Sequence, residues 1–115
     1  MAEAHRGDIF RARLSPPGAQ EESITVVVVS RDAFNAASPM VLIAPAVSSQ
    51  DVPASNYPTH VFLSKAAANL DQDLVIVAEQ IRPLAKERLE QPLGRVPQQS
   101  IGRLNAALRA VLDLI

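Results

Sequence analysis

The hydrophobic and polar positions of the chain predict a protein built mainly of short β-strands. Over residues 7–14 they alternate, so one face of the predicted strand is apolar and the other carries Arg11 and Arg13. Four consecutive valines at 26–29 predict a second strand, spanning 24–30, that is buried on both faces. Further apolar segments predict strands at 40–49, 59–64 and 73–78.

Other elements interrupt and follow these strands. Pro45 lacks an N–H to donate, so it predicts a sheet edge or a bulge within the third strand. Short helical turns are expected between residues 30 and 39 and after Lys65, and a bent pair of short strands is expected at 82–96. From Gln98 onward the apolar residues are spaced by three or four positions, which predicts a closing helix.

This order of several strands and one closing helix predicts a mainly β protein of the α+β class. The expected architecture is a small antiparallel sheet, or a partly closed barrel, capped by the helix. A length of 115 residues predicts one domain over residues 1–115.

Composition and charge narrow the kinds of site that the chain can build. There is no cysteine, and His5 and His60 lie far apart, so we expect no metal site and no cofactor. The formal net charge is −1, so a nucleic-acid partner would need a local basic patch. No apolar run approaches the ~20 residues of a membrane span, and the first residues lack an apolar targeting segment. We therefore expect a cytoplasmic protein without a membrane partner.

The loop before the four valines is the first candidate site. It begins at SPPG and runs through Gln20, Glu21 and Glu22, which makes it long for a hairpin connection. Long loops on rigid strands often carry function. Two solvated surface charges are the alternative interpretation of the acidic pair.

Several short motifs occur in an order that resembles the MazF/PemK family, the toxins of bacterial toxin–antitoxin pairs. They are RGDIF, VVVVS followed by DAFN, a strand ending in APAVSS, YPTHV and EQIR. Each is short, but together they extend from Arg6 to the terminal helix. The resemblance implies an SH3-like barrel with a C-terminal helix, a homodimer, and metal-free cleavage of single-stranded mRNA at short motifs. It also implies a cognate, MazE-like antitoxin that covers the RNA groove.

The family's catalytic residues match this chain unevenly. The resemblance implies an arginine immediately before the second strand, and that position falls on Ile24 or Thr25, depending on the register. The family's threonine after the third strand is matched by Ser48, whose hydroxyl offers the same hydrogen bonds. The family's loop glutamate is matched by Glu21 or Glu22. An isoleucine or threonine supplies no charge, so the resemblance implies a ribonuclease that lacks its central arginine. Three explanations are open: an inactivating substitution, another residue that has taken over the role, or a natural loss of catalysis.

Other residues are candidates for RNA contact, each with a structural alternative. Exposed strand arginines contact phosphates in some proteins, but more often they simply lie on the solvent-exposed face of a sheet. A lone histidine beside apolar residues is more often structural, and the arginine of EQIR favours a structural role. The candidate RNA-binding residues are Arg11, Arg13, Gln20, Glu22, Ser49, His60 and Arg82.

Two function hypotheses follow. The first is a homodimeric toxin that binds and cleaves single-stranded RNA at Ser48 and the 18–25 loop. The second is a non-catalytic dimer of the same fold that binds an antitoxin or blocks another protein, as the gyrase-poisoning relatives of this fold do. The absent arginine favours the second hypothesis, and the full-length resemblance favours the first.

Overall fold

The computed structural model of the protein describes residues 3–14, 22–52 and 57–113. Its strands lie close to the predicted ones, and both predicted helical turns and the closing helix are present. The elements in chain order are β1 (Asp8–Arg13), β2 (Ser23–Val28), α1 (Asp32–Ala37), β3 (Met40–Ser48), β4 (His60–Leu63), α2 (Lys65–Ala68), β5 (Leu74–Val77), the 3-10 turn η1 (Ala78–Gln80), β6 (Arg82–Ala85), the 3-10 turn η2 (Lys86–Arg88), β7 (Leu89–Arg95) and α3 (Gln98–Leu112).

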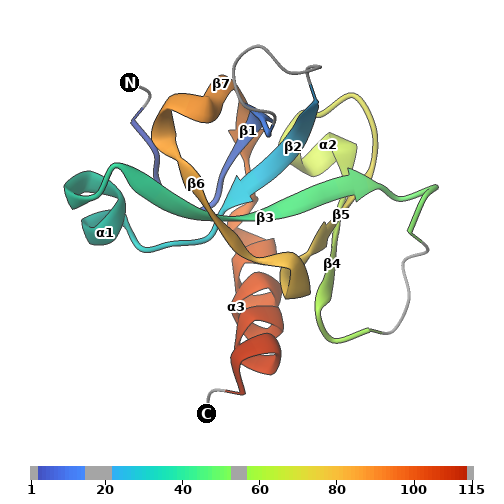
Figure 1. The fold of residues 1–115 in the computed structure, drawn as a ribbon. Coiled ribbons are helices and arrows are strands. Elements are labelled where there is room, and N and C mark those ends of the chain that lie inside the picture. Colours follow the sequence, from blue (N-terminus) through green and yellow to red (C-terminus); the bar gives the residue numbers. More distant parts are fainter. Residues whose placement is uncertain (1–2, 15–21, 53–56, 114–115) are drawn as a thin grey trace.

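The strands form one antiparallel sheet of seven (Figure 1). The order of neighbours is β4-β5-β3-β2-β1-β7, and β6 pairs with β3 outside this path. The predicted antiparallel sheet with a C-terminal helix is therefore confirmed. The sheet is not closed into a barrel, because the strands at the two ends of the order, β4 and β7, do not pair within the described part of the chain.

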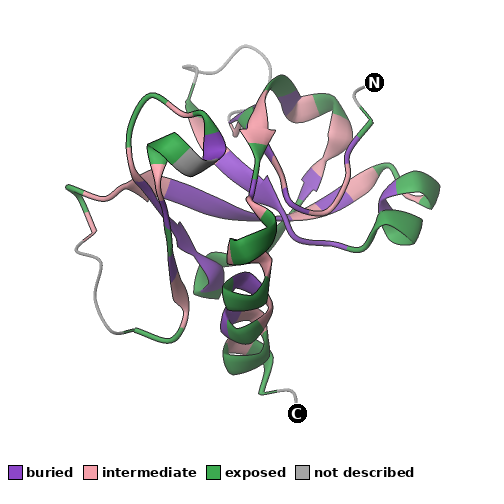
Figure 2. Ribbon diagram, turned by 180° about the vertical axis from the view of Figure 1, so that it is seen from behind, coloured by how far each residue is buried: buried purple, intermediate pink, exposed green. Residues whose placement is uncertain are grey.

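The four valines of the opening pattern are buried on both faces of the sheet, as predicted. Val27 and Val29 face a large cluster that includes Leu104 of α3, and we call this the helix-side core. Val26 and Val28 face a smaller cluster on the other side, the second core. Figure 2 shows the continuous buried band that results.

Pro45 occupies a central strand, where we predicted an edge or a bulge. On one side of β3, β2 pairs with Ile43–Ala46, and Val26 lies opposite Pro45. On the other side, β6 pairs with residues 40–43 and β5 pairs with residues 46–48. Pro45 lies in the gap between these two partners, and there the proline leaves no ladder hydrogen bond unmade. The predicted edge is therefore found only locally, because β3 is a central strand that has no described partner at Pro45 on the side where the sheet divides.

Helix α3 covers part of the helix-side face and projects beyond it (Figure 1). It packs against β4 and η1, with Leu104 and Ala107 fully buried, whereas Leu112 near its end is 51% exposed. No described helix is long and apolar enough to cross a membrane.

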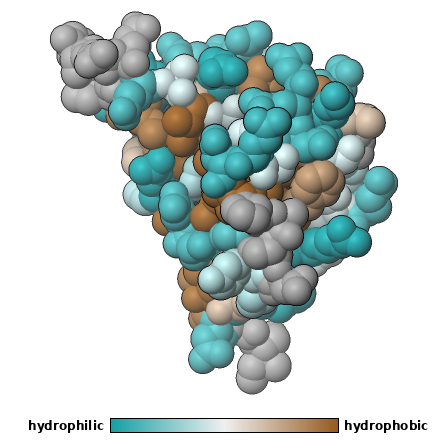
Figure 3. Space-filling view, turned by 90° about the vertical axis from the view of Figure 1, so that its right-hand side faces the viewer, coloured by the Kyte–Doolittle hydropathy of each residue, from teal (hydrophilic) through white to brown (hydrophobic). Residues whose placement is uncertain are grey.

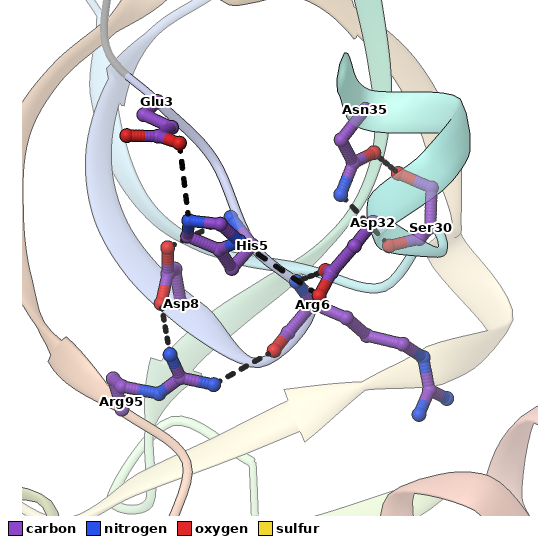
Figure 4. A network of polar contacts seen from close by, with 8 residues as sticks. All are labelled: Glu3, His5, Arg6, Asp8, Ser30, Asp32, Asn35 and Arg95. Carbon is purple, nitrogen blue, oxygen red and sulfur yellow. Dashed lines mark hydrogen bonds and ion pairs between the residues drawn. The ribbon is translucent and has the colours of Figure 1, made fainter. Parts of the chain in front are cut away.

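The N-terminal residues are attached by a polar network beside α1 (Figure 4). The carboxylate of Asp32 accepts a 2.7 Å hydrogen bond from the backbone N–H of Arg6. The Arg6 guanidinium donates instead to Val29 O at 3.0 Å and to Asn105 Oδ1 of α3 at 2.6 Å. Arg6 therefore connects the chain start, the end of β2 and the closing helix.

Candidate functional site

The helix-side face of the sheet changes from apolar to polar at the end remote from α3. Cross-strand partners share a face, and Arg11 is opposite Thr25, which in turn is opposite Ala46. Ser48 is two residues beyond Ala46 and therefore lies on the same face. The strand register thus places Arg11, Thr25 and Ser48 on one surface, separated by on the order of 10 Å at the spacing of neighbouring strands.

The loop between α2 and β5 lies beside these three side chains and is held in place by backbone hydrogen bonds. Asn69 adopts a left-handed conformation, with φ 58°, and ends α2. The Asp73 carboxylate accepts from the N–H of Lys65 at 2.8 Å, and its backbone carbonyl accepts from the N–H of Ser49 at 3.1 Å. The loop is therefore tied to both α2 and the end of β3.

Two small cavities flank this loop and share two of its residues, Asp71 and Gln72. One, of about 110 Å³, is also lined by Arg11, Thr25, Asn69, Leu70 and Leu93. The other, of about 170 Å³, is also lined by Ser48, Ser49, Gln50, Lys65 and Asp73. We call the area formed by both cavities the 69–73 surface. The structure brings the sequence-predicted Arg11, Thr25, Ser48 and Ser49 together there.

The 69–73 surface combines groups that suit a phosphodiester chain. The Arg11 side chain is exposed and makes no hydrogen bond or ion pair with any residue that the structure describes. The Ser48 hydroxyl accepts a 3.3 Å bond from the N–H of Gln50, which leaves its own proton to donate. Asp71 adds an exposed carboxylate, and Lys65 adds a second cation. Cations can bind phosphate, and the carboxylate can accept a proton.

The two positions available to the family's arginine lie on opposite faces of β2. Ile24 is half-buried and packs with Leu14 against the second core. Thr25 faces the 69–73 surface beside Arg11. Of these two β2 positions, only position 25 therefore directs its side chain toward a ligand at this surface.

The remaining predicted residues lie elsewhere or outside the described residues. Gln20 and Glu21 belong to the part of the loop that the structure does not describe. Glu22 is exposed just before β2, where its carbonyl accepts from Leu14 N at 2.9 Å. Arg13 is half-buried, and no described residue accepts a bond from its Nε. Arg82 is exposed and lines a separate cavity with Arg88 and Met40.

His60 packs against Tyr57 and Glu79 and does not line the 69–73 surface. Its Nε2 is 3.2 Å from the Glu79 carboxylate, and its ring centroid is 5.2 Å from that of Tyr57. The histidine side chain is only 12% exposed. Burial would raise the pKa of Glu79, but hydrogen bonds from its own backbone N–H, from Thr59 and from His60 outweigh burial, so this pKa is lowered.

A lowered carboxyl pKa has a definite consequence for stability. The stabilisation by Glu79 is fully present above its ordinary value of 4.5 and is lost as the pH falls through the lowered value. We expect Glu79→Gln to lower the thermal unfolding midpoint at pH 7 by less than about 6 °C, since a half-exposed pair contributes about 1 kcal/mol or less. The difference from the parent should shrink as the pH falls below 4.5 and vanish once the Glu79 carboxyl is protonated. Glu87→Gln, at an exposed position of η2, is the control and should differ little from the parent at any pH. A pH-independent difference for Glu79→Gln would contradict the assignment.

Sequence reasoning did not identify the loop residues of the site. The sequence predicts only a short helical turn after Lys65, and the stretch NLDQD at its end gives no functional motif. Its polar composition between an alanine-rich turn and an apolar strand was the available indication. Its proximity to Ser48 depends on β5 pairing with β3, a neighbour that is not next in sequence. Among the described residues, no group of three or more histidine, aspartate or glutamate side chains could hold a metal ion.

Comparisons with known proteins identify the family. A family model described as PemK-like, MazF-like toxin of type II toxin–antitoxin system matches residues 5–112. Endoribonuclease MazF of Staphylococcus saprophyticus is 37% identical over 111 residues, 95% of this chain and 91% of that protein. An endoribonuclease from a mycobacterial species, solved in complex with its cognate antitoxin, has the same fold, with a TM-score of 0.78, 23% identity and 97% coverage of both chains. A MazE–MazF structure from Deinococcus radiodurans gives 0.78, at 19% identity, and covers 99% of this chain and 100% of that one. The chain therefore belongs to the PemK-like, MazF-like toxins of type II toxin–antitoxin systems.

Proposed function

We propose that this toxin is a metal-independent endoribonuclease that cuts single-stranded RNA at the 69–73 surface. The observation that carries the proposal is that four side chains meet on one surface: Arg11, Thr25, Ser48 and Asp71. They supply two hydroxyl groups, a carboxylate and a guanidinium that no described residue pairs with. The 37% identity to an endoribonuclease supports the same activity.

The reaction needs only groups of this surface and water. The 2′-oxygen of a ribose attacks the adjacent phosphorus, and the bond from phosphorus to the 5′-oxygen breaks. The Asp71 carboxylate takes the 2′-hydroxyl proton and returns it to solvent, while the departing 5′-oxygen takes a proton from water. The products are a 2′,3′-cyclic phosphate and a 5′-hydroxyl. Cationic and hydroxyl groups stabilise the additional negative charge at phosphorus during the attack.

The proposal includes an antitoxin and a second copy of the chain as partners. Two relatives with this fold were solved with their antitoxins, one of them MazE. Exposed apolar side chains on the projecting part of α3 (Figure 3), among them Leu112, support a homodimer because burying them stabilises association. RNA as substrate implies that the toxin acts in the cytoplasm.

The activity is tested by incubating a long single-stranded RNA with the protein in EDTA. We expect the parent to cut at a short motif and Asp71→Asn to cut about 10²–10⁴-fold more slowly, since that is the usual contribution of a proton acceptor. The matched control is Asp113→Asn at the end of α3, where a left-handed φ of 56° suits asparagine. The control should cut like the parent. Equal rates for both variants would mean that Asp71 is not the proton acceptor. A parent that cuts no RNA would refute the proposed ribonuclease activity.

The missing arginine favours a second candidate, a toxin-fold dimer that binds a protein partner without cleaving RNA. Neither Ile24 nor Thr25 can supply positive charge. In this case the parent and Asp71→Asn are both inert toward RNA, while the protein still binds its antitoxin. The same cleavage assay therefore separates the two candidates.

A further inference from the structure

We propose that Arg11 supplies the phosphate-binding positive charge that the family's arginine supplies in its relatives. This inference rests on the proposed function, because it assigns a residue to the same reaction. It accounts for a toxin that lacks arginine at both Ile24 and Thr25.

The strand register places Arg11 where it can replace a missing arginine. Arg11 and Thr25 are direct partners across the β1–β2 pair and line the same cavity. Direct cross-strand partners have Cβ atoms about 4.5–5.5 Å apart. An arginine side chain is longer than this separation. A guanidinium carried by β1 therefore reaches the space that an arginine at position 25 would fill from β2.

The Arg11 guanidinium is also available to a ligand. Arg11 is exposed, and none of the described residues forms a hydrogen bond or an ion pair with its guanidinium. By contrast, Arg6 and Arg88 donate to backbone carbonyls, and Arg95 pairs with Asp8. An unpaired guanidinium keeps its planar set of donors, which suits two oxygens of one phosphate.

Other cations are less suited to the role. Arg13 lies two residues further along β1, and its Nε is buried without a partner among the described residues. Lys65 lines only the cavity that contains Ser48. Its ammonium acts as a point charge that cannot bind two phosphate oxygens in a fixed plane. Among these three cations, Arg11 is therefore the one that is exposed, has donors that no described residue occupies, and lies opposite Thr25 across the β1–β2 pair.

The proposed role is to stabilise the pentavalent phosphorus as the 2′-oxygen attacks and the 5′-oxygen leaves. Arg11 remains protonated throughout, because a guanidinium does not give up its proton in proteins. It therefore takes no part in proton transfer and acts through charge and hydrogen bonds alone. Removing such a donor costs about 10²–10³-fold in rate.

The test compares cleavage of a long single-stranded RNA in EDTA by the parent, Arg11→Ala and Arg11→Lys. We expect Arg11→Ala to lower kcat about 10²–10³-fold, and Arg11→Lys to restore part of the rate, because it keeps the charge but not the planar donors. The matched control is Arg103→Ala on the exposed side of α3, which should cut like the parent. The thermal unfolding midpoint of every variant should equal that of the parent, so that loss of folding does not explain loss of activity.

Moving the guanidinium from position 11 to position 25 tests whether the location of the charge matters. The double variant Arg11→Thr with Thr25→Arg moves the guanidinium from β1 to β2 within the same cavity, and we expect it to recover most of the parent rate. Ile24→Arg in the Arg11→Thr background should not recover it, since position 24 faces the second core.

Failure of the inference differs from failure of the proposed function. If the parent cuts and Arg11→Ala cuts equally fast, Arg11 is not the charge donor, but the ribonuclease stands. If the parent is inert and Thr25→Arg alone creates cleavage, Arg11 does not replace the arginine, and the natural chain is inactive. If neither cuts any RNA, the ribonuclease function is refuted together with the inference.

Discussion

Replacing Leu104 with alanine is expected to lower the free energy of unfolding by about 2–5 kcal/mol, the usual range when a buried leucine is truncated. Leu104 is completely buried in the helix-side core. It comes from α3, which begins only after the last strand, so it fixes the helix against strands formed much earlier in the chain. The cavity left by the truncation would weaken the attachment of α3 to β4.

Chemical denaturation of both proteins at pH 7 measures this change. The matched control is Leu112→Ala in the same helix, because Leu112 is 51% exposed and loses little buried area on truncation. The control should unfold within about 0.5 kcal/mol of the parent, provided that the protein is kept dilute enough to be monomeric. Equal losses for Leu104→Ala and Leu112→Ala would mean that α3 does not pack on the sheet as described.

The second large effect is expected at Gly94, where β7 passes close to the end of α2. A Cβ at this position would lie 2.7 Å from the carbonyl oxygen of Ala68, and a backbone atom cannot move away without displacing α2. We expect Gly94→Ala to cost about 1–3 kcal/mol of stability, as overpacked sites do. The displaced α2 carries Lys65 and leads into Asn69, so RNA cleavage should fall as well, by about 100-fold for a shift near 1 Å.

Gly102→Ala provides the control for Gly94→Ala. Apart from the adjacent residues and the backbone of its own helix, no described atom lies within 4 Å of the Cβ that would be added at Gly102, on the exposed side of α3. Alanine has the higher helix propensity, so this variant should be stabilised by about 0.5–1 kcal/mol and should cut RNA at the parent rate. If Gly94→Ala unfolds at the same denaturant concentration as the parent, then α2 does not rest on β7.

Much of the fold could be predicted from local patterns, for identifiable reasons. The valines at 26–29 indicated a strand covered on both faces, and both cores are present. The three-and-four spacing after Gln98 indicated the helix whose buried residues are Leu104 and Ala107. Both predictions depend on which side chains face the interior. The spacing of apolar residues along the sequence shows this directly.

The candidate site could not be predicted from the spacing of apolar residues, because it depends on which strands pair with each other. Counting residues left the arginine position open between Ile24 and Thr25, and only the pairing of β2 with β1 shows which of them faces Arg11. The loop residue Asp71 joins the site because β5 pairs with β3 across a long stretch of sequence. Such long-range pairings decide which polar side chains meet. The spacing of residues within one strand or helix does not reveal them.

The gap at Pro45 also has a consequence for how the chain avoids misfolding. In an antiparallel ladder, alternate residues donate to the same neighbour, and Pro45 stands where its missing donor would point away from β2. If β3 slipped by one residue against β2, the proline would occupy a donating position and the ladder would lose that bond. The slip would also exchange the side chains of the two cores. Pro45 therefore makes slippage of β3 against β2 unfavourable. This matters because the sheet is not closed and keeps edges at which strands can pair wrongly.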